Sequence, residues 1–130
     1  VVSGPANVFP REWQKAWRVC WCGDKELMRE YQRLVADFER LTVFRRAGQT
    51  NQYTGKMIAC LKAALEMEGL IASDRVAPGT PSLSEAERAQ FRRGYAELKN
   101  TLRQRIDPRW QTDGARSTAA GLPQKATGAS

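Results

Sequence analysis

The first ten residues read Val1-Val2-Ser3-Gly4-Pro5-Ala6-Asn7-Val8-Phe9-Pro10, and they predict how the chain enters its fold. An apolar pair such as Val1-Val2 is typical of the core of a strand. Gly4 and Pro5 then interrupt the strand, and Pro10 favours the first turn of a helix. We therefore expect a short buried strand that turns directly into a helix, with the strand's pairing neighbours outside residues 1–130.

Apolar residues at helical spacing predict four helices after this strand. The predicted helices span residues 10–22, 25 to about 46, about 53–68, and 84 to about 105. Gly23 is expected to end the first helix in a left-handed conformation, and Asp24 to cap the second. The third helix, which ends at Gly69, should be the most buried because little of its circumference is polar.

The last helix has a clear predicted start and a predicted stop. Ser84 and Glu87 have the spacing of a capping box, in which each side chain binds a free backbone amide of the other residue. Pro78 and Pro81 exclude regular structure from the connector before it, residues 72–83. Pro108 is expected to stop the helix, and residues 107–130 contain too few large apolar side chains to offset the entropy of ordering them. We expect a disordered tail there.

Composition narrows the class of protein. The hydrophobic content of 42% suits a packed domain, and the apolar runs are too short to cross a bilayer, so we expect a soluble, cytoplasmic protein that does not bind membranes. The net charge of +7 would suit an acidic partner such as nucleic acid. However, the basic residues are spread along the chain, and the doublets Arg45-Arg46 and Arg92-Arg93 lack flanking aromatic side chains that could stack on bases. This pattern disfavours a nucleic-acid site.

The cysteines do not indicate a metal site or a disulfide framework. The chain has three cysteines and no histidine, which argues against both arrangements. Cys20 and Cys22 are two residues apart on a predicted helix, so their side chains point in different directions. We expect Cys20, Cys22 and Cys60 to be buried or half-buried thiols, and we predict no metal and no cofactor.

The order of these features resembles the C-terminal portion of the dihydrodipicolinate synthase and N-acetylneuraminate lyase family, the pyruvate-type class I aldolases and dehydratases. The similarity covers residues 1–102. Four local features carry it: the family's last barrel strand and its exit, the corner after its eighth helix, its lysine-to-glycine helix, and its connector rich in proline. In this chain they correspond to Val2-Ser3 with Ala6-Asn7-Val8, to Gly23-Asp24, to residues 56–69, and to Arg75 with Pro78 and Leu83-Ser84. Gly79 departs from the pattern, which favours an apolar residue after the proline.

The resemblance implies a chain that is mainly α as it stands, with four helices after one short strand. Residues 1–22 would be the last strand and eighth helix of a (β/α)₈ TIM barrel, residues 23–106 its C-terminal helical extension, and residues 107–130 the tail. The family forms a Schiff base between a strand-borne lysine and a 2-oxo acid of the pyruvate type, and a tyrosine relays protons. Both residues would lie upstream of Val1. We therefore expect no catalytic residue in this chain, no activity by the chain alone, and a missing N-terminal barrel as its partner in a homo-oligomeric lyase.

Ser3, Gly4 and Asn7 are the residues that the resemblance places nearest a substrate, because the exit of the last strand faces the mouth of such a barrel. The alternative is local: Gly4 permits a tight turn, while Ser3 and Asn7 bind loop and helix amides. Lys56 is not expected to form a Schiff base, since it starts a helix and its ammonium group can reach water.

The tryptophan stripe of the first helix leaves a second hypothesis open. Trp13, Trp17 and Trp21 share one helical face, which we expect to pack the eighth helix against the barrel and the extension rather than to stack on a ligand. The alternative to the lyase segment is a free-standing basic helical module. Such a module would bind nucleic acid or a partner protein through the tryptophan stripe or through Arg92-Arg93.

Overall fold

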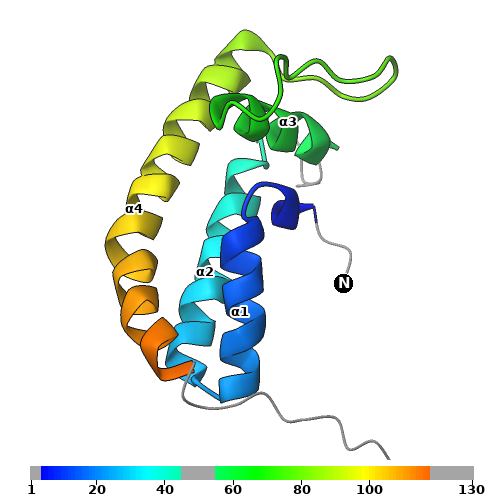
Figure 1. Cartoon of the computed structure of the whole chain (residues 1–130). Helices are drawn as coiled ribbons and strands as arrows, with labels where there is room; N and C mark the ends of the chain where they lie inside the picture. Colours follow the sequence, from blue (N-terminus) through cyan, green and yellow to red (C-terminus); the bar gives the residue numbers. More distant parts are fainter. Residues whose placement is uncertain (1–3, 45–54, 118–130) are drawn as a thin grey trace, which may run out of the picture.

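The computed structural model describes residues 4–44 and 55–117, and all regular secondary structure in this part of the chain is helical (Figure 1). A short 3-10 helix is followed by four α-helices: η1 (Pro5–Asn7), α1 (Pro10–Cys22), α2 (Lys25–Leu41), α3 (Met57–Met67) and α4 (Glu85–Ser117). The mainly α class is confirmed for these residues. The predicted strand at Val1-Val2 lies outside them, and the segment that leads into α1 is η1.

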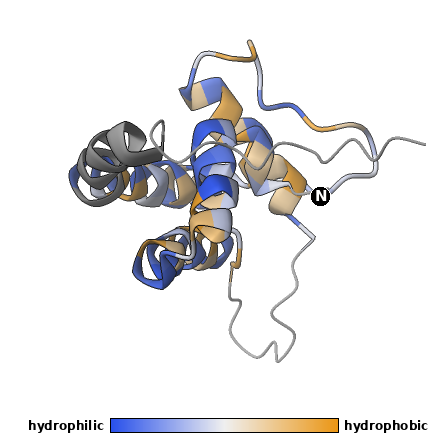
Figure 2. Ribbon diagram, turned by 60° about the horizontal axis from the view of Figure 1, so that its bottom comes forward, coloured by the Kyte–Doolittle hydropathy of each residue, from blue (hydrophilic) through white to orange (hydrophobic). Residues whose placement is uncertain are grey.

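The helices form a three-helix layer closed at one end by α3. α1 and α2 run side by side in opposite directions, and α4 lies along α2 and runs antiparallel to it (Figure 1). α3 packs against the first part of α4 and against η1. Hydrophilic and hydrophobic residues alternate along the helices (Figure 2), as expected of amphipathic helices that bury one side.

The corner between α1 and α2 has the predicted chemistry. Gly23 has a φ of 74°, the left-handed conformation that ends a helix at low cost only when the residue lacks a Cβ. The Asp24 side chain accepts a hydrogen bond of 2.9 Å from the Leu27 amide, which caps the start of α2. Both predictions are confirmed, so one Gly-Asp pair reverses the chain and sets the antiparallel α1–α2 hairpin.

We expect Gly23→Ala to lower the free energy of unfolding by about 1 kcal/mol, because an L-residue is strained in the left-handed region. A Cβ at this position would meet no atom within 4 Å, so the loss would come from the backbone and not from a clash. Urea denaturation of the chain would measure it. The control is Gly23→Asn, which should lose less because asparagine tolerates this conformation. An alanine variant as stable as the wild type would contradict the assignment.

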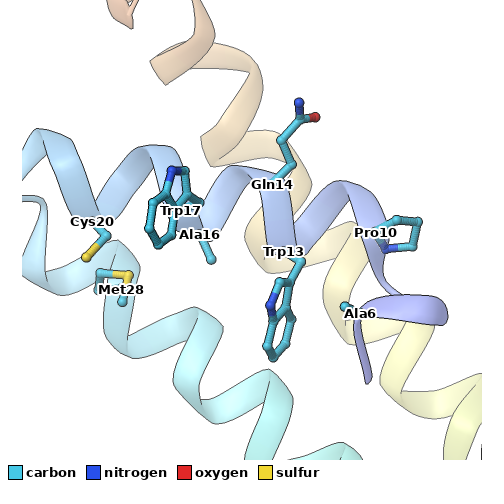
Figure 3. A pocket seen from close by; sticks show the side chains of 8 residues that line it. All are labelled: Ala6, Pro10, Trp13, Gln14, Ala16, Trp17, Cys20 and Met28. Atoms are coloured by element: carbon cyan, nitrogen blue, oxygen red, sulfur yellow. The ribbon is translucent and has the colours of Figure 1, made fainter. Parts of the chain in front are cut away.

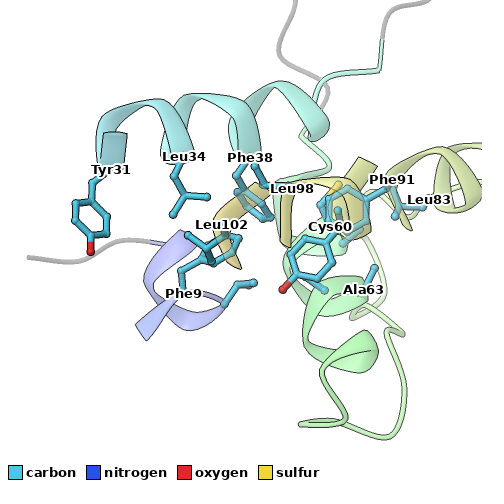
Figure 4. Close-up of a cluster of buried hydrophobic side chains, with 14 of the residues drawn as sticks. Phe9, Tyr31, Leu34, Phe38, Cys60, Ala63, Leu83, Phe91, Leu98 and Leu102 are labelled. Carbon is cyan, nitrogen blue, oxygen red and sulfur yellow. The ribbon is translucent and has the colours of Figure 1, made fainter. Parts of the chain in front are cut away.

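An aromatic cluster forms the centre of the core (Figure 4). The Phe38 ring lies edge-on to the Phe9 ring at 5.3 Å and to the Phe91 ring at 6.2 Å, while Phe91 and Tyr95 stack at 5.9 Å. All four side chains are almost completely buried. Since these rings come from the segment before α1, from α2 and from α4, the cluster ties together parts of the chain that are far apart in sequence.

Two helix ends differ from the sequence prediction near residue 50. α2 ends at Leu41 instead of about residue 46, because the Thr42 hydroxyl and amide both bind the Glu39 carbonyl and turn the chain out of the helix. α3 begins at Met57 instead of about residue 53, because Gly55 has a φ of 69° and cannot belong to a right-handed helix.

The predicted end of the last helix is wrong. α4 continues to Ser117, past Pro108, so the part of the predicted tail at residues 107–117 is helical. A proline inside a helix removes one hydrogen bond and favours a bend, but it does not force the helix to end. The rest of the predicted tail, residues 118–130, lies outside the described part of the chain.

The apolar circumference of α3 is only partly covered. Its buried residues are the small side chains Ala59, Cys60, Ala63 and Ala64, which allow a close approach to its neighbours. Ile58 on the same helix is 56% exposed. Burial of α3 is therefore confined to one side, although its sequence is apolar nearly all round.

Candidate functional site

The second and third tryptophans of α1 form an exposed aromatic face. Trp17 is 58% and Trp21 76% exposed, and their rings contact each other edge-to-face with centroids 5.9 Å apart. Val19 is the buried residue of α1. The predicted packing against the helical extension is therefore wrong for Trp17 and Trp21, whereas Trp13 is half-buried. The strip of α1 that meets α2 is narrow and centred near Val19, which leaves the wider aromatic stripe at its edge.

An open apolar groove of about 590 Å³ adjoins this face (Figure 3). It is lined by residues of η1, α1 and α2: Ala6, Pro10, Trp13, Gln14, Ala16, Trp17, Cys20 and Met28. Gln14 is the one polar side chain among these lining residues. We call Trp13, Trp17 and Trp21 together with this groove the tryptophan face, and its chemistry suits an apolar protein surface.

The residues expected to lie near a substrate have local roles where the structure describes them. Ser3 lies outside the described residues. Asn7 is exposed, and its side-chain amide donates to the Gly4 carbonyl at 3.1 Å. The predicted tight turn is present, because the Asn7 amide donates to the Gly4 carbonyl at 3.1 Å, but Gly4 has an ordinary right-handed conformation that any residue could adopt. A Cβ at Gly4 would lie 3.1 Å from the Leu61 Cδ1 atom. Gly4 thus allows η1 to approach α3 closely.

The three thiols lie in two different environments. Cys20 and Cys22 are exposed, which contradicts the prediction that they are buried or half-buried, while Cys60 is buried as predicted. No group of three or more histidine, cysteine, aspartate or glutamate residues that could hold a metal ion occurs within the described ranges.

Lys56 forms a part-buried ion pair instead of extending into water. Its ammonium group lies 2.6 and 2.7 Å from the two carboxylate oxygens of Glu87, and the side chains are only 14% and 16% exposed. The same ammonium lies 5.9 Å from the centroid of the Phe44 ring. The prediction that Lys56 extends to solvent is wrong, because the capping residue of α4 lies within reach of the first turn of α3.

The carboxylate of Glu87 serves both the ion pair and the predicted capping box. Glu87 accepts a bond of 2.8 Å from the Ser84 amide, and its own amide donates to the Ser84 hydroxyl at 3.2 Å. Burial alone would raise the pKa of Glu87, but the hydrogen bonds and charge of Lys56 and the bonds from Ser84 outweigh burial and lower it. The capping box is confirmed, and its acid also neutralises Lys56.

The Cys60 thiol lies close to this pair and is kept protonated. Burial, assisted by the negative charge of Glu87, raises its pKa to about 12, against the opposite effect of Lys56. A thiol with this pKa is a poor nucleophile at neutral pH.

A second polar cluster, missed by sequence analysis, joins the end of α3 to α4. The buried Tyr95 hydroxyl donates to the Glu68 carboxylate at 2.7 Å, and the Lys99 ammonium lies 3.2 Å from the same oxygen. Burial and the hydrogen bond to Glu68 raise the pKa of Tyr95. Burial alone would raise the pKa of Glu68 as well, but the hydrogen bonds from Tyr95 and Lys99 outweigh burial and lower that pKa. One sequence feature could have indicated this cluster: Tyr95 lies in the apolar stripe of the last helix, and a buried tyrosine hydroxyl needs a hydrogen-bond partner.

The Arg92-Arg93 doublet is not a free pair of cations. The Arg92 guanidinium lies 2.5 Å from the Glu66 carboxylate on α3, while Arg93 is exposed. Neutralisation of Arg92 reduces the positive potential that the nucleic-acid alternative requires.

The comparisons with known proteins do not identify a relative: no protein-family model, curated protein or solved structure matches this chain. Within residues 4–44 and 55–117, no helix combines the length and the apolar character needed to cross a bilayer.

Proposed function

We propose that this chain is the C-terminal helical segment of a cytoplasmic lyase of the dihydrodipicolinate synthase and N-acetylneuraminate lyase type. Its role is structural: α1 closes a TIM barrel and the later helices form an extension. The complete protein would form a Schiff base with a 2-oxo acid. The lysine and tyrosine of that reaction would lie in the barrel that precedes residue 1.

The tryptophan face is the observation that carries this proposal. In the family that this chain resembles, α1 would correspond to the eighth helix of the barrel, whose apolar side covers the barrel strands. Trp17 and Trp21 present a large apolar surface on the side of α1 that α2 does not cover. Burying such a surface is favourable by about 25 cal/mol per Å², so a barrel packed here would stabilise both parts.

The helix ends support the proposal at the positions of the resemblance. The Gly23-Asp24 corner separates α1 from α2, and Gly69 follows α3 in a left-handed conformation with a φ of 71°. The connector then runs without regular structure to the Ser84 capping box. The α1–α2 corner, the end of α3 and the start of α4 thus agree with the positions expected from the resemblance, which supports the proposal.

The proposal is tested by expressing the reading frame extended upstream of Val1 and treating the protein with pyruvate and borohydride. We expect a stoichiometric adduct on an upstream lysine, and none on Lys56, because that ammonium group is engaged by both carboxylate oxygens of Glu87 and lies at the start of a helix instead of on a barrel strand. The isolated chain of 130 residues is the control and should give no adduct. An extended protein that is not trapped, or an adduct at Lys56, would contradict the proposal.

Matched tryptophan variants test the docking itself. In the isolated chain Trp21→Ala should change the free energy of unfolding by less than about 0.5 kcal/mol, because the side chain is exposed. In the extended protein the same change should cost about 3 kcal/mol, the usual effect of truncating a buried tryptophan. Arg18→Ala, an exposed neighbour on α1, is the control. Equal effects of Trp21→Ala in the two proteins would argue against a barrel on this face.

A further inference from the structure

A second cavity, of about 180 Å³, lies where the connector meets α3 and the first turn of α4. Its lining combines charged, hydroxyl and apolar side chains, namely Asp74, Arg75, Val76, Ser82, Leu83 and Arg88. Pockets for drug-sized ligands usually exceed about 300 Å³. This cavity therefore suits a much smaller molecule, and it lies in a part of the chain that the docking of a barrel on α1 does not involve.

The charges around the cavity leave one cation without a partner. Asp74 is buried and forms an ion pair with Arg88, so the charges of these two side chains offset each other. The guanidinium of Arg75 makes no ion pair within the described residues, although it lines the same cavity. The Lys62 ammonium, which donates to the Arg75 carbonyl, adds a further positive charge nearby. Asp74, Arg75 and Arg88 together thus give the lining a net positive charge, which favours an anion over a cation.

Two local hydrogen bonds order the connector that contributes to the wall of the cavity. The Arg75 amide donates to the Ser73 hydroxyl at 3.2 Å, and the Thr80 amide donates to the Ala77 carbonyl at 3.0 Å. Leu83 is buried beside the start of α4. A site that is formed before its ligand arrives loses little entropy on binding.

We propose that this cavity binds a small organic carboxylate with a short apolar body. The guanidinium of Arg75 pairs with the carboxylate, which also accepts a hydrogen bond from the Ser82 hydroxyl. The apolar body rests on Val76 and Leu83. Because the ligand would contact both the connector and the start of α4, its binding would stabilise their junction, and the proposal does not depend on the lyase assignment.

The test uses the isolated chain, with butyrate as the probe and butyramide as the matched uncharged control. We expect butyrate to shift the backbone NMR resonances of Val76, Ser82 and Leu83 in a saturable manner, and butyramide to cause no saturable shift. Arg75→Gln should weaken butyrate binding about tenfold or more, the usual effect of losing a charge-assisted hydrogen bond. Arg93→Gln, an exposed arginine on α4 outside this cavity, should leave binding unchanged.

Three outcomes would overturn the proposal: no saturable shift with butyrate, equal responses to butyrate and butyramide, or unchanged binding by Arg75→Gln. The Arg75→Gln variant should remain folded, because the Arg75 residue is exposed and its backbone amide can still donate to the Ser73 hydroxyl. A loss of butyrate binding would therefore not reflect unfolding. Unchanged resonances of α1 and α2 would verify the fold. Failure here would leave the borohydride test of the lyase proposal unaffected, since that test concerns residues upstream of Val1.

Discussion

Phe38→Ala is expected to remove about 3–5 kcal/mol from the free energy of unfolding, the largest effect of any single change considered for this chain. Phe38 is 0% exposed, and its ring contacts the rings of Phe9, Phe91 and Tyr95 with centroids 5.3, 6.2 and 6.4 Å away. Deleting the ring leaves a cavity among three aromatic side chains, one from the segment before α1 and two from α4. Domains of this size are stable by only about 5–15 kcal/mol, so much of the stability would be lost.

Chemical denaturation followed by circular dichroism measures this effect. Phe38→Leu is the comparison that keeps a large apolar side chain at this position, and it should lose only about 1–2 kcal/mol because less volume is removed. Gln32→Ala, an exposed position on the same helix, should change the stability by less than about 0.5 kcal/mol. If Phe38→Ala and Gln32→Ala were equally stable, the packing of α2 against α4 would be wrong.

Glu87→Gln is expected to cost about 2–3 kcal/mol, because it leaves the Lys56 ammonium partly buried without an opposite charge. Glutamine can still complete a capping box with Ser84, so this variant isolates the ion pair from the cap. Ser84→Ala, which removes only the hydroxyl that accepts from the Glu87 amide, should cost about 1 kcal/mol.

A double variant separates the loss of the Lys56–Glu87 ion pair from any other effect of the substitution on the contact between α3 and α4. Lys56→Met combined with Glu87→Gln removes both charges, and an apolar side chain of similar length lies next to Phe44. We expect the double variant to recover at least about half of the stability lost by Glu87→Gln, as found when buried ion pairs are replaced by apolar groups. A double variant no more stable than Glu87→Gln would show that the unpaired ammonium is not the cause.

The pH dependence of stability gives an independent check on the same carboxylate. The pKa of Glu87 is lowered on folding from its ordinary value of 4.5, so its contribution is present above pH 4.5 and is lost as the pH falls through the lower folded value. The difference in stability between the wild type and Glu87→Gln should therefore shrink below pH 4.5. Glu68, whose pKa is also lowered, titrates in both proteins and so does not affect this difference.

Local signals predicted the local structure of this chain well. The left-handed Gly23, the Asp24 cap and the Ser84–Glu87 box each involve residues within four positions of one another, and the structure confirms all of them. Their chemistry depends on backbone groups that any neighbouring sequence supplies. For that reason no knowledge of the tertiary structure was needed.

Several of the predictions that failed depended on which elements meet, whereas the ends of α2 and α4 and the start of α3 differed for local reasons. The exposure of Trp17 and Trp21 could not be derived from periodicity, because a helical stripe shows that residues share a face and not which part of the face is covered. The pairing of Lys56 with Glu87 joins residues 31 positions apart. The cavity that we propose binds a carboxylate likewise lies between the connector, α3 and α4. Which of its two arginines lacks an acidic partner becomes clear only from the ion pair between Asp74 and Arg88.

The most direct test of the proposed docking is the rate at which Cys20 is alkylated in the isolated chain and in the protein extended upstream of Val1. Cys20 lines the groove of the tryptophan face, whereas Cys60 is buried within the helices of this chain and serves as the internal control. Iodoacetamide labelling followed by peptide mass spectrometry resolves the two thiols. We expect rapid labelling of Cys20 in the isolated chain, at least about tenfold slower labelling in the extended protein because a barrel covers the groove, and negligible labelling of Cys60 in both. Equal labelling rates of Cys20 in the two proteins would contradict the proposal that α1 closes a barrel.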